Sequence, residues 1–175
     1  MTVFIHGLDT SASCTKCQIL KDRSPQVVIP SLDLLDINAS LSSLEELVNE
    51  EVTLIAGASF GGFYAHYLAK KYACDLLLIN PIINPLHYIE HVDLGQRDVS
   101  LLREAIKSML NFNANQNYVN RVELLLGLHD TIIDYKEAQN YFRGQSFKYY
   151  EDDHSLIEAF RAYTHEKETL LSKYL

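Results

Sequence analysis

The sequence predicts an α/β fold of three layers, in which a mainly parallel, doubly wound sheet is covered by helices on both faces. Six short apolar runs alternate along the chain with longer stretches of helical pattern. Several runs are apolar at consecutive positions, as expected for strands buried on both faces. With 175 residues and 47% hydrophobic composition, the chain can bury one sizeable core. We therefore expect a single domain over residues 1–175.

The strand and helix candidates follow each other in regular alternation. The strand candidates are 3–5 (VFI), 26–30 (QVVIP), 52–56 (VTLIA), 75–80 (DLLLIN), 122–127 (VELLLG) and 146–150 (SFKYY). The helix candidates are 13–21, 42–49, 60–72, 100–111, 135–142 and 155–174. Ser42 and Glu45 have the spacing of a capping box, which predicts that the second helix begins at Ser42.

The stretch from Pro81 to Tyr118 is the one irregular region of the chain. It is too long for a simple link between a strand and a helix. Excursions of this kind at the carboxyl edge of a parallel sheet commonly shape the binding crevice. We therefore expect a cap-like excursion at about 81–118 that forms part of the substrate pocket.

Charge and hydropathy disfavour nucleic-acid and membrane partners. The chain has 23 Asp and Glu against 15 Lys and Arg, a net charge of -8, and no basic cluster longer than Lys70-Lys71. No apolar run approaches the roughly 18 residues that a membrane span needs. The N-terminal MTVFIHG lacks the features of a signal peptide. We expect a soluble cytoplasmic protein, whose oligomeric state the sequence leaves open.

Residues 57–62, GASFGG, fill the pattern G-x-S-x-G between a strand candidate and a helix candidate. In a nucleophile elbow, this pattern raises a serine on a sharp turn from strand to helix. Small residues at Gly57 and Gly61 allow the strand and the helix to approach closely. The helix N-terminus then favours negative charge at the serine oxygen. Ser59 is therefore the candidate nucleophile, with a small residue in a glycine-rich bend as the alternative.

A second signal is the HG turn at the end of the first strand candidate. Acyl transfer to serine needs two N–H donors for the oxyanion, one from the residue after the serine and one from a loop beside an adjacent strand. We expect these donors to be the backbone N–H groups of Phe60 and Leu8. We expect His6 to brace the turn by a hydrogen bond rather than to act as the base.

The base and the acid are expected downstream, in the order Ser, then Asp or Glu, then His. His154 lies between the last strand candidate and the final helix candidate and is the candidate base. Asp130 and Asp134 both follow a strong strand candidate. Asp130 lies closer to that strand and is the favoured acid, whereas Asp134 can cap the next helix.

Two other motifs offer metal or redox chemistry. Cys14 and Cys17 form a C-x-x-C, which could be a redox pair or half of a zinc site, but we favour buried cysteines on a helix that begins near Ser11 or Ser13. HYIEH at 87–91 matches H-x-x-E-H, in which His87 and His91 would hold zinc, Glu90 would activate water, and Glu166 or Glu168 would be a third ligand. We favour a solvated or crevice-lining helix face there, and expect no metal or cofactor.

The motifs together resemble the α/β-hydrolase superfamily, through FIHG, GASFGG, GLHD and DDHS in that order. The segments GASFGGFYAHYLAKKY, LLINPIINP and LGLHDTIIDYKEA look like those of the small YqiA-type esterases. This resemblance implies a minimal hydrolase core without the first strands of larger members, and a catalytic set of Ser59, Asp130 and His154. It implies a serine esterase or thioesterase that acts on a small-molecule ester or acyl thioester without a cofactor. Since the superfamily also has non-catalytic members, a binding protein is the alternative.

Overall fold

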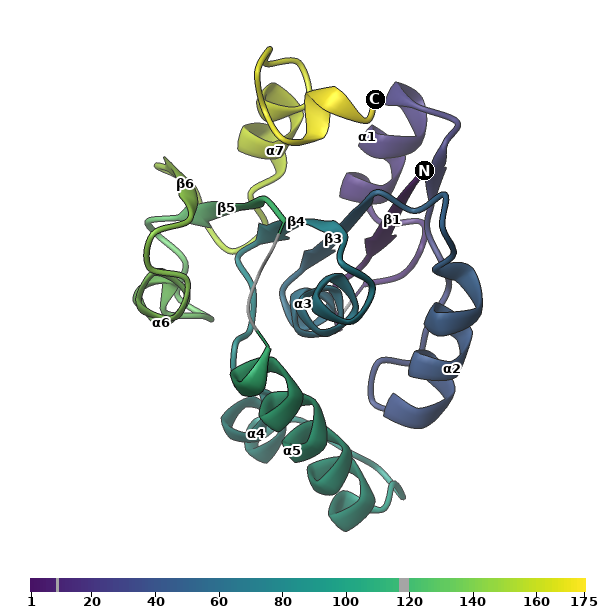
Figure 1. Cartoon of the computed structure of the whole chain (residues 1–175). Coiled ribbons are helices and arrows are strands. Elements are labelled where there is room, and N and C mark those ends of the chain that lie inside the picture. Colours follow the sequence, from purple (N-terminus) through teal and green to yellow (C-terminus); the bar gives the residue numbers. More distant parts are fainter. Residues whose placement is uncertain (9, 117–119) are drawn as a thin grey trace.

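The protein, described by a computed structural model over residues 1–8, 10–116 and 120–175, is built on one sheet. Six parallel strands lie between two layers of helices (Figure 1). This architecture confirms the predicted three-layer α/β fold with a parallel sheet. All strand pairs among the described residues are parallel.

Each strand candidate overlaps one strand of the sheet, whose order is β2-β1-β3-β4-β5-β6, although β1 begins one residue before its candidate and β3 ends two residues after. The strands are β1 (Thr2–Ile5), β2 (Val27–Val28), β3 (Leu54–Ala58), β4 (Asp75–Ile79), β5 (Val122–Gly127) and β6 (Ser146–Tyr150). The chain moves from β1 to β2 in one direction, and from β2 back past β1 to β3 in the other. The carboxyl ends of β1 and β3 therefore flank a topological switch point, where α/β sheets bind their ligands.

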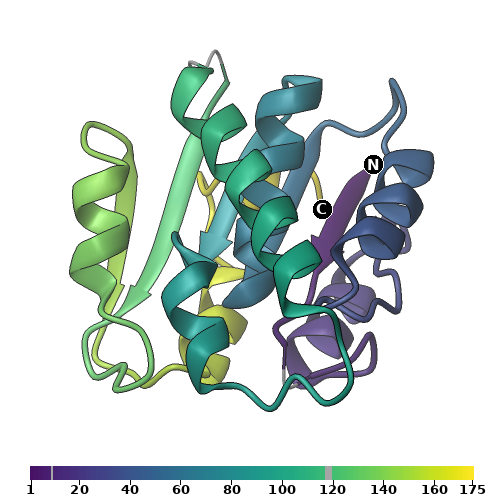
Figure 2. The same cartoon turned by 90° about the horizontal axis from the view of Figure 1, so that it is seen from below.

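The change of direction also distributes the helices between the two faces. Right-handed crossovers place α1 on one face and the later connecting helices on the other, and α7 joins α1 (Figures 1 and 2). The helices are α1 (Thr15–Arg23), α2 (Ile37–Leu47), α3 (Phe60–Tyr72), α4 (Pro85–Tyr88), α5 (Val99–Asn115), α6 (Tyr135–Tyr141) and α7 (Ile157–Tyr163), with the 3₁₀ helices η1 (Ile89–His91) and η2 (Leu171–Lys173).

Alternate strand residues bury themselves in two separate cores, one on each face. In β1, Val3 and Ile5 face the core under α3, while Phe4 faces the core under α1 and α7. In β4, Leu76 and Leu78 likewise face the core under α3, while Leu77 faces the core under α1 and α7. Because both faces are covered, the central strands are apolar at most positions, as the sequence pattern indicates, and Asp75 of β4 and Glu123 of β5 are buried polar exceptions.

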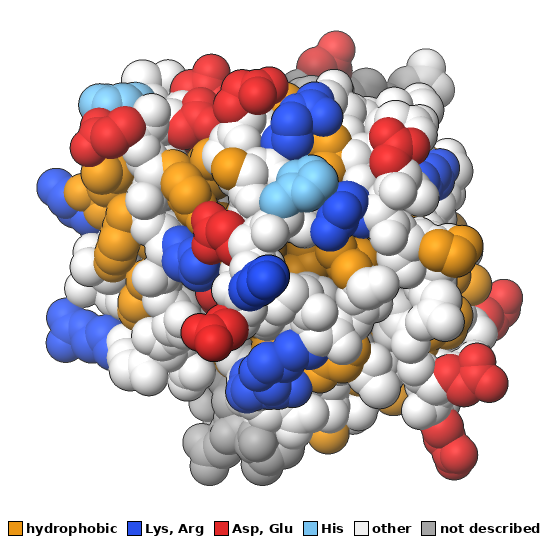
Figure 3. Space-filling model, turned by 90° about the horizontal axis from the view of Figure 1, so that it is seen from above, with side chains coloured by type: hydrophobic (Ala, Val, Ile, Leu, Met, Phe, Trp, Pro, Cys, Tyr) orange, Lys and Arg blue, Asp and Glu red, His pale blue; other side chains and the backbone are white. Residues whose placement is uncertain are grey.

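The outer surface over α1 and α7 carries charges of both signs (Figure 3). Lys and Arg side chains are interspersed there with Asp and Glu, so this face has no large patch of a single charge sign. In the parts of the chain that the structure describes, no helix has the length and apolar character that a membrane crossing requires.

The predicted start of the second helix at Ser42 is wrong. Helix α2 begins at Ile37, five residues earlier, and its N-cap is Asp36, whose carboxylate accepts a hydrogen bond from the N–H of Ala39 at 3.1 Å. The hydroxyl of Ser40 donates to the carbonyl of Asp33 at 2.7 Å and ties the first turn to the preceding loop. An aspartate at the N-cap satisfies the free N–H groups without the later serine.

The described part of the excursion consists of α4, η1 and α5, which lie on the α3 side of the sheet (Figure 2). Aromatic contacts join it to α3, with ring centroids 6.1 Å apart for Tyr88 and Phe60 and 4.9 Å apart for Phe112 and Tyr67. The last two residues of the expected range, 117 and 118, lie outside the described residues. The excursion thus forms an additional layer of helix over α3.

The final helix is shorter than the predicted 155–174. Helix α7 ends at Tyr163, because the chain then turns to meet Glu123 of β5. The buried Glu123 carboxylate accepts hydrogen bonds from the Tyr163 hydroxyl at 2.8 Å and from the Leu170 N–H at 2.7 Å. A charged acceptor inside the sheet therefore fixes the C-terminal segment against the core.

We predict that Glu123→Ala lowers the free energy of unfolding by about 3 kcal/mol, because it leaves the Tyr163 hydroxyl and the Leu170 N–H buried without an acceptor. Tyr163→Phe removes only one of these bonds and should cost about 1 kcal/mol. Urea unfolding followed by circular dichroism measures both. Glu50→Gln, at an exposed position, is the control and should stay within about 0.5 kcal/mol of the wild type. A Glu123→Ala protein as stable as this control would contradict the anchoring role.

Candidate active site

Ser59 occupies the turn between β3 and α3 in a backbone conformation that non-glycine residues seldom adopt. Its φ is 52° and its ψ is −124°. Such a residue costs on the order of 1–3 kcal/mol and persists only where its surroundings fix it. Here the Ser59 N–H donates to Ile79, and its carbonyl accepts from Gly62 and Ile82, all at 3.0 Å. The sharp turn expected of the G-x-S-x-G pattern is therefore present.

The two glycines of the pattern let α3 begin close to the sheet. A Cβ atom on Gly61 would collide with the carbonyl oxygens of Ile5 and His6, and one on Gly57 would collide with the carbonyl of Gly61. The start of α3 thus lies directly against the end of β1. This contact places the HG turn after β1 beside the side chain of Ser59.

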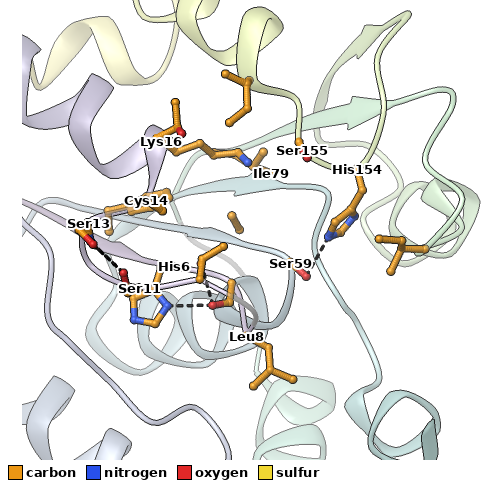
Figure 4. Close-up of a pocket in the computed structure, with 17 residues that line it drawn as sticks. His6, Leu8, Ser11, Ser13, Cys14, Lys16, Ser59, Ile79, His154 and Ser155 are labelled. Atoms are coloured by element: carbon orange, nitrogen blue, oxygen red, sulfur yellow. Dashed lines mark hydrogen bonds between the residues drawn. The ribbon is translucent and has the colours of Figure 1, made fainter. Parts of the chain in front are cut away.

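The three side chains predicted for catalysis meet at the carboxyl edge of the sheet. The Nε2 atom of His154 lies 3.2 Å from the Oγ of Ser59, and its Nδ1 atom lies 2.7 Å from the Oδ2 of Asp130 (Figure 4 for the former contact). The Asp130 side chain is only 1% exposed, whereas that of His154 is 23% exposed. A carboxylate, an imidazole and a hydroxyl are therefore linked in series by hydrogen bonds, and the hydroxyl lies at the cavity.

Asp130 is held as a carboxylate by its hydrogen bonds. Burial raises the pKa of its carboxyl group, but the hydrogen bond from His154 and those from the N–H groups of Ile133 and Ile132 lower the pKa, which ends below its ordinary value. The remaining oxygen of this group thus accepts from the His154 ring. An ionised partner at Nδ1 leaves Nε2 as the atom that faces Ser59 and can accept a proton from it.

Asp134, the alternative acid, lies elsewhere. It is the N-cap of α6, where its carboxylate accepts from the N–H of Lys136 at 2.9 Å. Its position therefore matches the capping role, and Asp130 is the carboxylate that contacts His154.

Asn80 joins the segments that carry these groups. It follows β4 and adopts a positive φ of 40°. Its side-chain amide donates to the carbonyls of Asp153 and His154 at 3.2 and 3.0 Å and accepts from the Gly127 N–H at 2.8 Å. The buried Asn80 thus connects the end of β5, before Asp130, to the loop that carries His154. This role of Asn80 was not predicted from the sequence, although an asparagine directly between a strand and Pro81 is a signal for it.

Leu8 and Phe60, the residues predicted to donate to an oxyanion, belong to segments next to Ser59. Phe60 is the first residue of α3, where the N–H has no partner within the helix. Gly7, which precedes Leu8, approaches Ser59 so closely that a Cβ on it would lie 3.3 Å from the Ser59 Cβ. The Nδ1 of His6 lies 2.8 Å from the Gly7 carbonyl, so His6 braces the turn as expected.

A cavity of about 580 Å³ opens beside Ser59 and His154 (Figure 4). Its apolar walls come from Phe4, Leu8, Ile79, Ile132 and Ile157, and one wall is the start of α1. The ammonium-bearing side chain of Lys16 extends from that wall. None of the described residues of the 81–118 excursion lines this cavity, because the excursion packs over α3.

The H-x-x-E-H segment does not bring zinc ligands together. His87 belongs to α4 and His91 to η1, so the two histidines do not share a continuous α-helix, and Glu90 pairs with Arg103 at 3.2 Å. Outside residues 9 and 117–119, no three or more His, Cys, Asp and Glu side chains are grouped so that they could hold a metal ion.

Comparisons with known proteins place the chain among α/β-hydrolase folds. The family described as "Uncharacterised protein family (UPF0227)" matches residues 1–168. The esterase domain of a Rhodothermus marinus protein is similar with a TM-score of 0.68 and 18% identity over 93% of this chain and 82% of that chain. Alpha/beta hydrolase domain-containing protein 10 from mouse is similar with a TM-score of 0.68 and 12% identity, over 93% of this chain and 85% of that chain. MGS-MChE2, an alpha/beta hydrolase enzyme from a lagoon-sediment metagenome, is similar with a TM-score of 0.68 and 18% identity, over 99% of this chain and 90% of that chain.

We predict that Asn80→Gly lowers the free energy of unfolding by about 2–3 kcal/mol, because it removes the side-chain hydrogen bonds between the two loops. Asn80→Ala loses the same bonds and must also place a Cβ at positive φ, so it should cost roughly 1 kcal/mol more. Denaturant unfolding of both variants, with the exposed Asn38→Ala as control, measures the difference. An alanine variant at least as stable as the glycine variant would show that the backbone at this position is not constrained.

Proposed function

We propose that this chain is a serine hydrolase that cleaves carboxylic esters or acyl thioesters. The chain belongs to the uncharacterised protein family UPF0227, and it has the motifs of the YqiA-like esterases. One observation carries the proposal: Asp130, His154 and Ser59 are linked by hydrogen bonds, and Ser59 faces a cavity. The fold shared with proteins named as hydrolases and esterases supports it.

In the first half of the proposed reaction, Ser59 becomes acylated. The Nε2 of His154 takes the proton of the Ser59 hydroxyl as its Oγ attacks the carbonyl carbon. The negative charge then moves to the carbonyl oxygen, which the N–H groups of Leu8 and Phe60 stabilise, together with the N-terminus of α3. Collapse of this intermediate breaks the bond to the leaving group, and His154 returns the proton to the departing alcohol or thiol.

The second half regenerates the serine. Water enters the cavity, transfers a proton to His154 and attacks the acyl carbon. The acid product leaves as Ser59 recovers its proton. Asp130 remains ionised throughout, and its hydrogen bond orients the ring and stabilises the imidazolium form. The proposed steps use only side chains and backbone groups of this chain together with water.

The cavity favours a small substrate with an apolar acyl group. Its volume lies within the roughly 300–1,000 Å³ usual for small-molecule sites, and its lining combines apolar side chains such as Leu8 and Ile79 with polar ones. Both an oxygen and a sulfur leaving group satisfy the same mechanism. Ile132 lies at the rim and is 58% exposed, so it can contact the part of the substrate outside the cavity.

The alternative is a binding protein that has the fold but no turnover. A fluorophosphonate probe separates the two, because it reacts only with an activated serine. We predict that the probe adds one covalent group to the folded protein, located on Ser59 by peptide mass spectrometry, and that Ser59→Ala abolishes the label. Unfolded protein is the control and should remain unlabelled. Folded wild-type protein without a label would refute the hydrolase proposal.

The two aspartates give a matched pair of variants. We predict that Asp130→Asn lowers kcat on a p-nitrophenyl ester by about 10³–10⁴-fold, because the ring loses the acceptor that sets its tautomer. Asp134→Asn keeps a good N-cap residue for α6 and should change kcat less than about twofold. Steady-state hydrolysis, also measured with acyl-CoA thioesters and with His154→Ala, tests this difference. Equal losses in both aspartate variants would move the acid role away from Asp130.

A further inference from the structure

The two cysteines of the C-x-x-C lie in and behind the wall of the same cavity. Cys14 is the N-cap of α1 and lines the cavity, across from Ser59 (Figure 4). Cys17 lies one turn further along α1 and is 0% exposed. The predicted helix thus begins at Thr15 rather than near Ser11 or Ser13, and only one of the two thiols is accessible from the cavity.

The two sulfur atoms face each other. Their Sγ atoms are 2.7 Å apart, and the N–H of Cys17 donates to the Sγ of Cys14 at 3.4 Å. The Cys17 thiol also lies 3.4 Å from the carbonyl of Ser11, which closes the loop before the helix. The fold therefore holds a half-buried thiol and a fully buried thiol in contact, with the half-buried one at a helix N-terminus.

The surroundings favour a thiolate on Cys14 and a thiol on Cys17. The hydrogen bond from Cys17 is the largest cause that lowers the pKa of Cys14 to about 6, and Lys16 adds a smaller effect. The same hydrogen bond and burial raise the pKa of Cys17. Cys74, buried away from this cavity, has its pKa raised by burial to about 11. Since the thiolate is the reactive form, Cys14 is the nucleophilic cysteine among the three.

We propose that Cys14 and Cys17 form a thiol–disulfide exchange site, whose substrates are small-molecule disulfides that enter the cavity beside Ser59. This site needs no part of the hydrolase mechanism, because its nucleophile is a second group on the opposite wall of the cavity.

The exchange proceeds in two balanced steps. The Cys14 thiolate attacks one sulfur of the disulfide, whose S–S bond breaks, and one half leaves as a thiolate that takes up a proton. Cys17 then loses its proton and attacks Cys14, which releases the second half as a thiol and forms the Cys14–Cys17 bond. The small disulfide is reduced to two thiols, and the two protein thiols are oxidised to one disulfide.

The mixed-disulfide intermediate and the final Cys14–Cys17 disulfide differ in what they place in the cavity. The mixed disulfide on Cys14 fills space beside Ser59, whereas the Cys14–Cys17 disulfide adds no atoms to the cavity. If Ser59 is the nucleophile of the proposed hydrolase, the mixed disulfide excludes its substrate, and attack by Cys17 restores access. This consequence alone rests on the proposed function.

Intact-protein mass spectrometry tests the exchange with excess hydroxyethyl disulfide at pH 7. We expect the wild type to lose two hydrogens and retain no adduct, and Cys17→Ser to retain one mercaptoethanol adduct on Cys14. Cys14→Ser should show neither product, and Cys74→Ser should behave as the wild type. We expect Cys14 to react at least about tenfold faster than Cys74. Cys17→Ala repeats the trapping if the serine variant fails to fold.

Two results would overturn the exchange site: no adduct on Cys14 in either Cys17 variant, or an adduct confined to Cys74. Ester hydrolysis tests separately whether a mixed disulfide on Cys14 blocks Ser59. The hydrolysis rate of each Cys17 variant is measured before and after loading, that is, formation of the mercaptoethanol adduct on Cys14, and again after treatment with dithiothreitol. We expect loading to lower the rate more than tenfold and the reductant to restore it. An unchanged hydrolysis rate in the loaded protein would refute the claim that the adduct blocks access to Ser59, but it would not affect the evidence for the exchange from mass spectrometry. Absence of any hydrolysis beforehand would instead count against the hydrolase.

Discussion

The turn at Ser59 is the constraint on which the rest of the site depends. A serine at positive φ is unfavourable by itself, so the surrounding backbone must hold it. Three hydrogen bonds do so, with Ile79 of β4, Ile82 after β4 and Gly62 of α3. The same turn starts α3 against the end of β1, where only glycine at position 61 leaves enough room. The strained backbone, the free N–H groups and the neighbouring HG turn are therefore parts of one packing arrangement.

The other half of the site depends on hydrogen bonds between loops. Asp130 and His154 follow different strands, and the backbone pairs Leu128 with Tyr150 and His129 with Asp152 beyond the end of the sheet. The buried Asn80 adds a third connection from β4. With the carboxylate nearly inaccessible to water, the ring is oriented by groups that have little freedom to move, which is the preorganisation that the proposed acyl transfer would require.

The direction change in the sheet explains why two candidate nucleophiles share one cavity. Because α1 and α3 lie on opposite faces and both begin at the carboxyl edge, their N-termini face the same crevice at the switch point between β1 and β3. Ser59 precedes one helix and Cys14 is the cap of the other. The proposed hydrolase chemistry and the proposed thiol chemistry thus both follow from the same topology.

The sequence by itself determined the succession of features along the chain: six apolar runs, a serine in a glycine-rich turn, and an aspartate and a histidine downstream. These features are local, because periodicity and turn composition reflect neighbouring residues. The tertiary structure brings Asp130, which the sequence favoured over Asp134, into contact with His154. It alone decided that Asn80 connects three segments and that α2 begins at Ile37 and not at Ser42. It also decided that the described part of the 81–118 excursion packs over α3, while Cys14 and the start of α1 form one wall of the cavity. Contacts between residues far apart in the chain depend on crossover direction and packing, which no local pattern specifies.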